Sequence, residues 1–234
     1  MNLLVYEEKH VTDAGELRLQ GETARHAFKI LKVEPGSRLS VGALGGSVGH
    51  ATVLESTPRE LRLGALELTA SPPPPLPVEL LLALPRPKFL GRILQDVTSL
   101  GVKRIHLLQT ARVEKSYWSS SLLGSESIQR CLRLGLQQGC DTLLPTVRFH
   151  HSWREALERA LDPERPLWVA EGSADEPLAT GAPRESAQLL IGPEGGLVAP
   201  ELEELAKRGA RFGHLGMRVL RVETAVSAAL SRWL

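Results

Sequence analysis

The order of apolar and polar residues changes about a third of the way along the chain. In the first 70 residues, short runs with partial alternation predict strands, and apolar positions at helical spacing from Ala24 to Leu31 predict one helix that Thr23 could cap. Glycines between the middle strands mark a hairpin. The expected strands are residues 3–5, 38–41, 50–54 and 61–68. These elements predict a small β-barrel with one or two helices.

Beyond residue 77, mostly apolar runs alternate with helical periodicity. Such runs are typical of strands that are covered on both faces. The expected strands are residues 78–83, 104–108, 167–170, 189–191 and 211–213. The expected helices are residues 88–100, 125–139 and 224–234. Two more helices are expected, one that begins at the capping-box pair Ser152 and Glu155 and one that begins near Pro200. This alternation predicts an α/β domain with a mainly parallel sheet.

A proline-rich run separates the two patterns. Residues 71–77 contain five prolines, which fix the backbone and cannot donate hydrogen bonds to a sheet. We therefore expect a stiff, extended linker. The domain prediction is a small β domain over residues 1–70, a linker over 71–77 and an α/β domain over 78–234.

Composition narrows the class of protein without changing this picture. Hydrophobic residues make up 42% of the chain and charged residues 24%, which is ordinary for a globular domain and excludes a disordered chain. No apolar run reaches the roughly 20 residues of a spanning helix, and the amino terminus lacks the pattern of a secretory signal. The two cysteines form no disulfide framework or zinc spacing. We expect a cytoplasmic protein without a metal or a membrane partner.

The net charge conceals a basic region. A formal charge of +1 argues against a nucleic-acid partner, because phosphate contacts use lysine and arginine. However, residues 79–150 carry 10 basic and 5 acidic side chains, and residues 151–234 carry 10 basic and 13 acidic ones. The net charge of the whole chain therefore does not exclude a nucleic-acid partner, and the positions of the lysines and arginines are the better guide.

One serine motif does not predict a hydrolase. Gly45-Gly46-Ser47-Val48-Gly49 matches the nucleophile-elbow pattern Gly-x-Ser-x-Gly. That motif requires a strand, a sharp turn and a helix, whereas this one lies between two expected strands. A plain glycine-rich hairpin is the better interpretation.

Two segments near the carboxyl terminus could carry chemistry. In residues 189–197, a buried strand leads into the turn Gly-Pro-Glu-Gly-Gly, where the glycines let a ligand approach the main chain. In residues 214–225, Arg218, Arg221 and Glu223 follow a short strand. An ordinary connection and a surface ion pair between Arg221 and Glu223 remain alternatives.

Together these segments resemble the RsmE-type methyltransferases of the SPOUT superfamily. The matching motifs are Leu-Ile-Gly-Pro-Glu-Gly-Gly followed by Glu201, and Leu-Gly-x-Arg-Val-Leu-Arg-x-Glu-Thr-Ala from Leu215. Arg25-His26 followed by Ile30-Leu31-Lys32 looks like the family's amino-terminal motif, and Leu100-Gly101-Val102 and Gln138 fall where its middle motifs lie. The chain departs from the family pattern at Asp96, Ser99, Gln137 and Asp141.

The resemblance implies a fold and an activity. The larger domain would be a trefoil-knotted, parallel-sheet SPOUT domain, and the small one a PUA-like, RNA-binding β-barrel. The protein would be a homodimer that uses S-adenosylmethionine to methylate N3 of one uridine in 16S ribosomal RNA, presented as naked RNA or in the small ribosomal subunit. Alternatives are a SPOUT enzyme acting on another RNA position or on transfer RNA, and a non-catalytic RNA-binding assembly factor.

The resemblance also assigns candidate residues. Arg221 would stabilise negative charge on the uracil, and either Glu194 or Glu223 would be the general base or would orient the arginine. The cofactor would be held by Leu190, Ile191, Gly192, Gly195, Gly196, Leu215, Gly216 and Leu220. Glu171 and Gly172, which follow the strand ending at Ala170, would form a third wall of the cofactor site.

Candidate RNA contacts come from both domains. On the small-domain helix, Arg25, Lys29 and Lys32 fall on one side at about 100° per residue, although a solvated face is the alternative. Trp118 could stack on a base or pack inside the protein. The candidate RNA-binding set is Arg25, His26, Lys29, Lys32, Lys88, Arg92, Arg112, Arg130 and Arg133.

Overall fold

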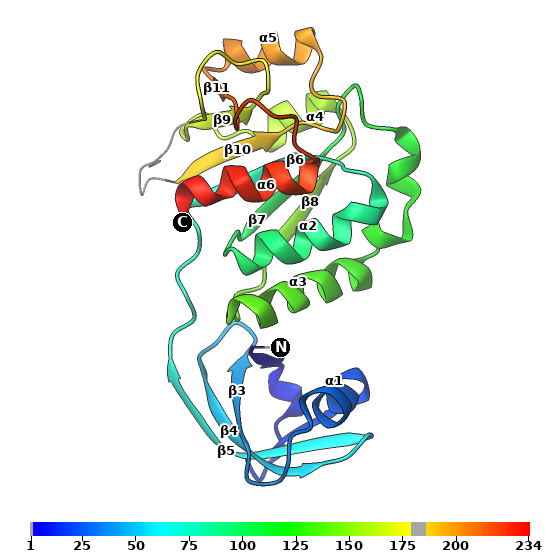
Figure 1. Cartoon of the computed structure of the whole chain (residues 1–234), viewed down its shortest axis with the longest axis vertical. Coiled ribbons are helices and arrows are strands. Elements are labelled where there is room, and N and C mark those ends of the chain that lie inside the picture. The colour runs from blue at the N-terminus through cyan, green and yellow to red at the C-terminus, as the bar shows by residue number, and fades with distance from the viewer. Residues whose placement is uncertain (1, 179–185) are drawn as a thin grey trace. The chain divides into compact units, whose positions relative to one another are not determined.

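The computed structural model describes residues 2–178 and 186–234, and Figure 1 shows its elements. The chain forms two compact units. The first extends to Pro73 and includes Leu136–Leu144, and the second comprises Pro74–Gly135 and Pro145–Leu234. In the described part of the chain, no helix has the length and apolar character needed to span a membrane.

The first unit is built on a curled, mixed sheet of five strands in the order β1-β3-β4-β5-β2. β1 pairs with β3 in parallel, and the other pairings are antiparallel. Side chains such as Leu17, Val41 and Leu63 fill the core, as expected for a barrel-like domain. The strands are β1 (Leu4–Tyr6), β2 (Leu17–Gln20), β3 (Arg38–Ala43), β4 (Val48–Ser56) and β5 (Glu60–Ala70).

The helix of this unit differs from the predicted one. α1 (Gly21–His26) begins after Gln20, so Thr23 lies inside it and is not its cap. A π-helical turn, Ala27–Leu31, follows directly and ends at Lys32, whose φ is +50°. A π turn advances by a smaller angle per residue than an α-helix. Lys32 lies past the end of this helix, so the angular step that placed it on one side with Arg25 and Lys29 does not apply to it.

The glycine-rich motif at residues 45–49 spans part of the loop of the β3–β4 hairpin and the first two residues of β4. Gly45 has a φ of +77°, a conformation that glycine adopts without steric cost. Its amide donates to the carbonyl of Thr142 at 2.8 Å, and the Thr142 hydroxyl donates to the carbonyl of Gly46. The hairpin interpretation is confirmed, and these bonds explain why residues 136–144 belong to this unit.

The second unit contains an entirely parallel sheet of six strands in the order β11-β9-β10-β6-β7-β8. The predicted α/β class with a parallel sheet is confirmed. β8 was not predicted, because its sequence TVRFH is half polar and the strand lies at the edge. The strands are β6 (Val78–Ala83), β7 (Arg104–Leu108), β8 (Thr146–His150), β9 (Leu167–Ala170), β10 (Ala187–Ile191) and β11 (Arg211–Gly213).

Helices cover this sheet. α4 (Trp153–Arg159) and α5 (Ala199–Lys207) pack against the strand face that presents Leu81, Leu108 and Leu190. α2 (Pro87–Ser99) and α6 (Val222–Leu230) contact each other, and both lie in front of the sheet in Figure 1. The remaining helix is α3 (Ser125–Gly139). The Ser152 hydroxyl accepts from the Glu155 amide at 3.1 Å, so the predicted cap of α4 is confirmed.

The strand order reverses next to β6, since β7 and β8 lie on one side of it and β10, β9 and β11 on the other. Ligands of open parallel sheets bind outside the carboxyl ends of the strands near such a reversal. Here the loops that follow β9, β10 and β11 meet, and the candidate site lies among them.

Candidate functional site

A cavity of about 250 Å³ lies at the carboxyl ends of β9, β10 and β11. The structure brings eight of the ten predicted cofactor residues to its wall: Glu171, Gly172, Ile191, Gly192, Gly196, Leu215, Gly216 and Leu220. Leu190 does not line it, because successive strand residues point to opposite faces and Leu190 packs under α4 and α5. Gly195 faces the Arg112 side chain instead.

Main-chain contacts that require glycine hold the walls of this cavity together. The Glu171 amide donates to the Gly213 carbonyl at 3.0 Å, and the Leu178 amide to the His214 carbonyl at 2.8 Å. A Cβ on Gly213 would lie 2.4 Å from the Cα of Leu178, so only glycine permits this approach. Gly216, with a φ of +122°, donates its amide to Nδ1 of His214 at 3.0 Å. Much of the wall is therefore backbone in a fixed arrangement.

Two side chains from other segments fix the Gly-Pro-Glu-Gly-Gly turn. The Arg112 guanidinium donates to the carbonyl of Gly195 and, at 3.5 Å, to that of Leu197. The buried Glu201 carboxylate accepts from the Ala111 amide at 2.7 Å and from the Val198 amide at 3.0 Å. Arg112, a candidate RNA contact by sequence, thus lies against the turn and orients it, which its place in the sequence does not reveal.

A second cavity, of about 420 Å³, adjoins the first. It is lined by Arg86, Lys88, Phe89, Glu194, Leu220, Arg221, Val222 and Glu223. Three of these, Glu194, Leu220 and Val222, also line the first cavity. All three predicted catalytic residues are here, although Glu194 is 27 positions from Arg221 in sequence. The fold therefore places a cation and two carboxylates beside the glycine-rich cavity.

Helix ends position these side chains. Arg221 is the N-cap residue of α6, and Glu223 lies in its first turn. Arg86 is the N-cap residue of α2. Its amide donates to Oε1 of Glu194 at 3.2 Å, and its Nε lies 3.9 Å from the same oxygen. In the sequence, Arg86 is one of the cations of the basic region and Phe89 has no distinguishing pattern, because only the packing of α2 on α6 brings them to the cavity.

The remaining candidate RNA contacts lie on both units of the protein. On the first unit, Arg25, Lys29 and Lys32 are exposed, as are the apolar side chains of Phe28 and Ile30 beside them. His26 follows Arg25 and is partly buried. On the second unit, Arg92 is exposed on α2, and Arg130 and Arg133 lie on α3.

Trp118 has a packing role in this structure. Its ring lies 4.3 Å from that of His151, centroid to centroid, and 6.2 Å from that of Phe149. Its indole N–H donates to Oε1 of Gln109. These contacts favour the packing alternative over stacking on a base.

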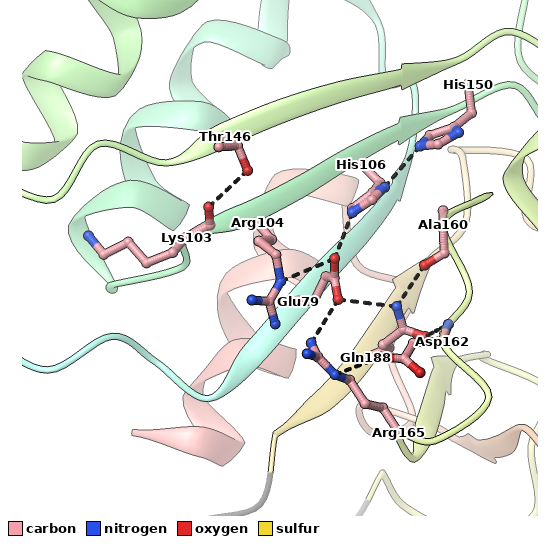
Figure 2. A network of polar contacts seen from close by, with 10 residues as sticks. All are labelled: Glu79, Lys103, Arg104, His106, Thr146, His150, Ala160, Asp162, Arg165 and Gln188. Carbon is pink, nitrogen blue, oxygen red and sulfur yellow. Dashed lines mark hydrogen bonds and ion pairs between the residues drawn. The ribbon is translucent and has the colours of Figure 1, made fainter.

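A separate polar network lies near the amino ends of β6 and β10 (Figure 2). The Glu79 carboxylate, on β6, receives contacts from Nε2 of His106 at 2.7 Å, Nε of Arg104 at 3.3 Å and an Arg165 guanidinium nitrogen at 3.1 Å. Gln188, on β10, donates to it at 3.3 Å. These strand ends are opposite to the cavities, so the network is structural.

Two histidines extend this network across the neighbouring strands β7 and β8, on the face of the sheet that carries Glu79. Nδ1 of His106 lies 2.9 Å from Nε2 of His150, and both side chains are buried (Figure 2). The distances fit a chain in which His150 donates to His106 and His106 donates to Glu79. Their spacing in the sequence indicated no ligand set, and within residues 2–178 and 186–234 no cluster of three His, Cys, Asp or Glu side chains could hold a metal ion.

This network predicts that acid destabilises the second unit in two stages. Burial lowers the pKa of His150 below its ordinary 6.5, and nearby His106 lowers it further. Burial alone would raise the pKa of Glu79, but the hydrogen bond from His106 and the charge of Arg104 outweigh it, so the pKa falls to about 2. Both groups bind protons more weakly in the folded state, so the stability they contribute is lost as pH falls.

We expect the Tm to decline as pH falls below about 6.5, where His150 protonates in the unfolded chain, and to decline again between about 4.5 and 2, where Glu79 does. Calorimetry from pH 8 to pH 3 measures this. The variant His150→Phe should lack the first decline. A Tm of the parent protein that is constant from pH 7 to pH 5 would contradict the assignment to His150.

Comparisons with known proteins agree with this architecture. A family model described as an RNA methyltransferase domain matches residues 72–234. The ribosomal RNA small subunit methyltransferase E of Treponema pallidum is 29% identical over 98% of this chain and 89% of that protein. The Bacillus subtilis protein of the same name is 25% identical over 96% of this chain and 91% of its own length.

Solved structures show the same fold over nearly the whole chain. The ribosomal RNA small subunit methyltransferase E of Neisseria gonorrhoeae, bound to S-adenosyl methionine, superposes with a TM-score of 0.75 at 21% identity, over 98% of this chain and 96% of that one. A methyltransferase of Legionella pneumophila in complex with the cofactor SAM gives 0.71 at 21% identity, over 98% and 95%. At these identities the likeness establishes the fold.

Proposed function

The chain belongs to the RNA methyltransferase domain family, and on this premise we propose that it transfers the methyl group of S-adenosylmethionine to N3 of a uridine in 16S ribosomal RNA. The observation that carries the proposal is the pair of adjoining cavities that share Glu194, Leu220 and Val222. Relatives named ribosomal RNA small subunit methyltransferase E support the substrate class.

The first cavity suits S-adenosylmethionine. Its walls combine apolar side chains, Ile191, Leu215 and Leu220, with the main chain of Gly192, Gly196 and Gly216. An adenine ring needs an apolar slot with a few main-chain partners, which this wall supplies. When bound, the cofactor supplies a methyl group that its sulfonium charge already activates. Arg112 and Glu201 fix the Gly-Pro-Glu-Gly-Gly turn through their hydrogen bonds to the Gly195 carbonyl and the Ala111 amide.

The second cavity suits the uracil. N3 of uracil carries a proton and lies on the Watson–Crick edge, so the base must leave its stack to enter the cavity. A carboxylate of Glu194 or Glu223 would accept the N3 proton, and the negative charge left on the ring oxygens would be stabilised by the Arg221 guanidinium. Because both carboxylates line the cavity, either can be the base, and the other would orient the arginine.

The finer architecture is part of the proposal. We propose that the second unit is a trefoil-knotted SPOUT domain and that the first is a PUA-like RNA-binding domain, which uses the exposed Arg25, Lys29 and Lys32. Met217 and Val219 line the first cavity, yet their side chains are fully exposed. Because exposed apolar side chains often mark an interface, we propose that a second copy of the chain covers them in a homodimer. We also propose a cytoplasmic location, since the proposed substrate is ribosomal RNA.

Nucleoside analysis tests the proposed reaction. Small ribosomal subunits that lack methylation at N3 are incubated with the protein and methyl-labelled S-adenosylmethionine, and the digested 16S RNA is analysed by mass spectrometry. The expected product is 3-methyluridine at one position. Label on a ribose hydroxyl, or in transfer RNA alone, would favour the other SPOUT activities. Failure of S-adenosylmethionine to bind in a calorimetric titration would favour a non-catalytic assembly factor.

A further inference from the structure

Three residues of the second cavity belong neither to the sequence motifs nor to the proposed catalytic residues. Arg86, Lys88 and Phe89 come from the start of α2, whereas the other lining residues come from the Gly-Pro-Glu-Gly-Gly turn and from the start of α6 and the residues before it. Phe89 is half-buried, and the Lys88 ammonium lies 4.7 Å from its ring centroid. Two helices, α2 and α6, begin at this cavity, and the amino ends of helices favour negative charge.

The contacts of Arg86 separate the role of its main chain from that of its side chain. The main-chain amide makes the 3.2 Å hydrogen bond to Glu194. The guanidinium Nε, at 3.9 Å from the same oxygen, is near Glu194 without a hydrogen bond of normal length. Glu194 therefore keeps its hydrogen bond from α2 when the guanidinium is removed.

The Watson–Crick edge of uracil has a carbonyl acceptor, the N3–H donor and a second carbonyl acceptor, in that order. A protein site that recognises this edge must present a hydrogen-bond donor, an acceptor and a second donor in the same order. The cavity contains such a set in Arg86, Glu194 and Arg221, a carboxylate with a guanidinium from each of two helix ends. Cytosine presents an amino group and an unprotonated N3, which would place a donor against a cation and a lone pair against the carboxylate.

We propose that Arg86 recognises the uracil together with Arg221. The Arg86 guanidinium donates a hydrogen bond to one ring carbonyl, and Arg221 donates to the other. The inference rests on the proposed function, because it assigns the recognition of the base in the same reaction. As N3 gives its proton to a carboxylate, charge grows on both carbonyl oxygens, and Arg86 stabilises one of them. The aromatic ring of Phe89 and the side chains of Leu220 and Val222 provide the apolar walls for the base.

The variant Arg86→Ala tests this role with 16S RNA transcribed with either uridine or 5-fluorouridine and assembled into small subunits. Removal of one charge-stabilising donor costs about 10²-fold in rate, so kcat/KM should fall by about that factor with uridine. Affinity for S-adenosylmethionine should be unchanged, since Arg86 does not line the first cavity. The 5-fluorouracil ring has a more acidic N3–H and needs less stabilisation, so the loss should be clearly smaller with that substrate. Arg86→Lys, which keeps a cation, should recover part of the rate.

The matched control is Arg154→Ala, an arginine that is 85% exposed on α4 and pairs with Glu158, and it should keep full activity. Equal losses with uridine and 5-fluorouridine would show that Arg86 acts only through the fold, and an unchanged rate would show that it has no role. Either result overturns the assignment of Arg86 while leaving the proposed function intact. Absence of 3-methyluridine with the wild-type protein would overturn the proposed function and this inference together.

Discussion

Replacing Arg221 with alanine is expected to slow methyl transfer by about 10²–10³-fold, the usual cost of removing one preorganised donor from a site where negative charge develops. Arg221 lines the second cavity and not the first. The proposed reaction leaves negative charge on the uracil in the second cavity, while the cofactor is held by the turns around the first. We therefore expect S-adenosylmethionine to bind the variant as it binds the parent.

Single-turnover measurements of methyl transfer, combined with calorimetric titration of S-adenosylmethionine, separate these two effects. Arg221→Lys keeps the charge but loses the planar set of donors, so its rate should lie between those of the parent and the alanine variant. Full activity of Arg221→Ala would remove Arg221 from the mechanism. A parallel loss of rate and cofactor affinity would instead indicate that Arg221 holds the loops of the first cavity.

Replacing Glu79 with alanine is expected to have the largest effect on stability. The buried His106 would lose the acceptor of its Nε2–H, and Arg104 and Arg165 would lose the carboxylate that neutralises them. Breaking a buried ion pair by removing one partner typically costs about 3–5 kcal/mol. For a chain of this size, such a loss corresponds to a decrease in Tm of roughly 10 °C.

Differential scanning calorimetry at pH 7 measures this decrease. The matched control is Glu158→Ala, which removes an exposed carboxylate from an i,i+4 pair on α4 and should change the Tm little. Because the Glu79 network lies at the amino ends of the strands, the Glu79→Ala protein should retain methyl transfer at temperatures where it remains folded. A Tm equal to that of the parent would show that the network contributes nothing to stability.

The elements that depend on local sequence were predictable. The strands at 104–108, 167–170 and 211–213 have the bounds expected from their apolar runs, and α3 has the bounds expected from its periodicity. β2 and β8 were missed, because short edge strands with polar positions give a weak pattern. The helix of the first unit was misjudged, because the π turn at Ala27–Leu31 breaks the angular step on which the prediction relied.

The candidate site was predictable only where residues are close in sequence. The turns that carry Gly192, Gly196 and Gly216 could be found because they belong to contiguous motifs that follow strands, although an ordinary connection remained an alternative until the two motifs were taken together. Arg86 and Phe89 carry no such signal, because they open an ordinary helix. Arg112 resembled any other arginine in a basic region until the structure placed it on the Gly195 carbonyl.

The sequence by itself determined the change from a β-rich to an α/β pattern, the parallel sheet, the glycine-rich turns and the resemblance to one methyltransferase family, since all of these depend on local periodicity or contiguous motifs. Only the tertiary structure decided which charged side chains meet. Glu79 joins His106, Arg165 and Gln188, and Arg86 joins Glu194, across 27 to 109 positions of sequence. Strand order and helix packing set such contacts, and no local pattern records the strand order.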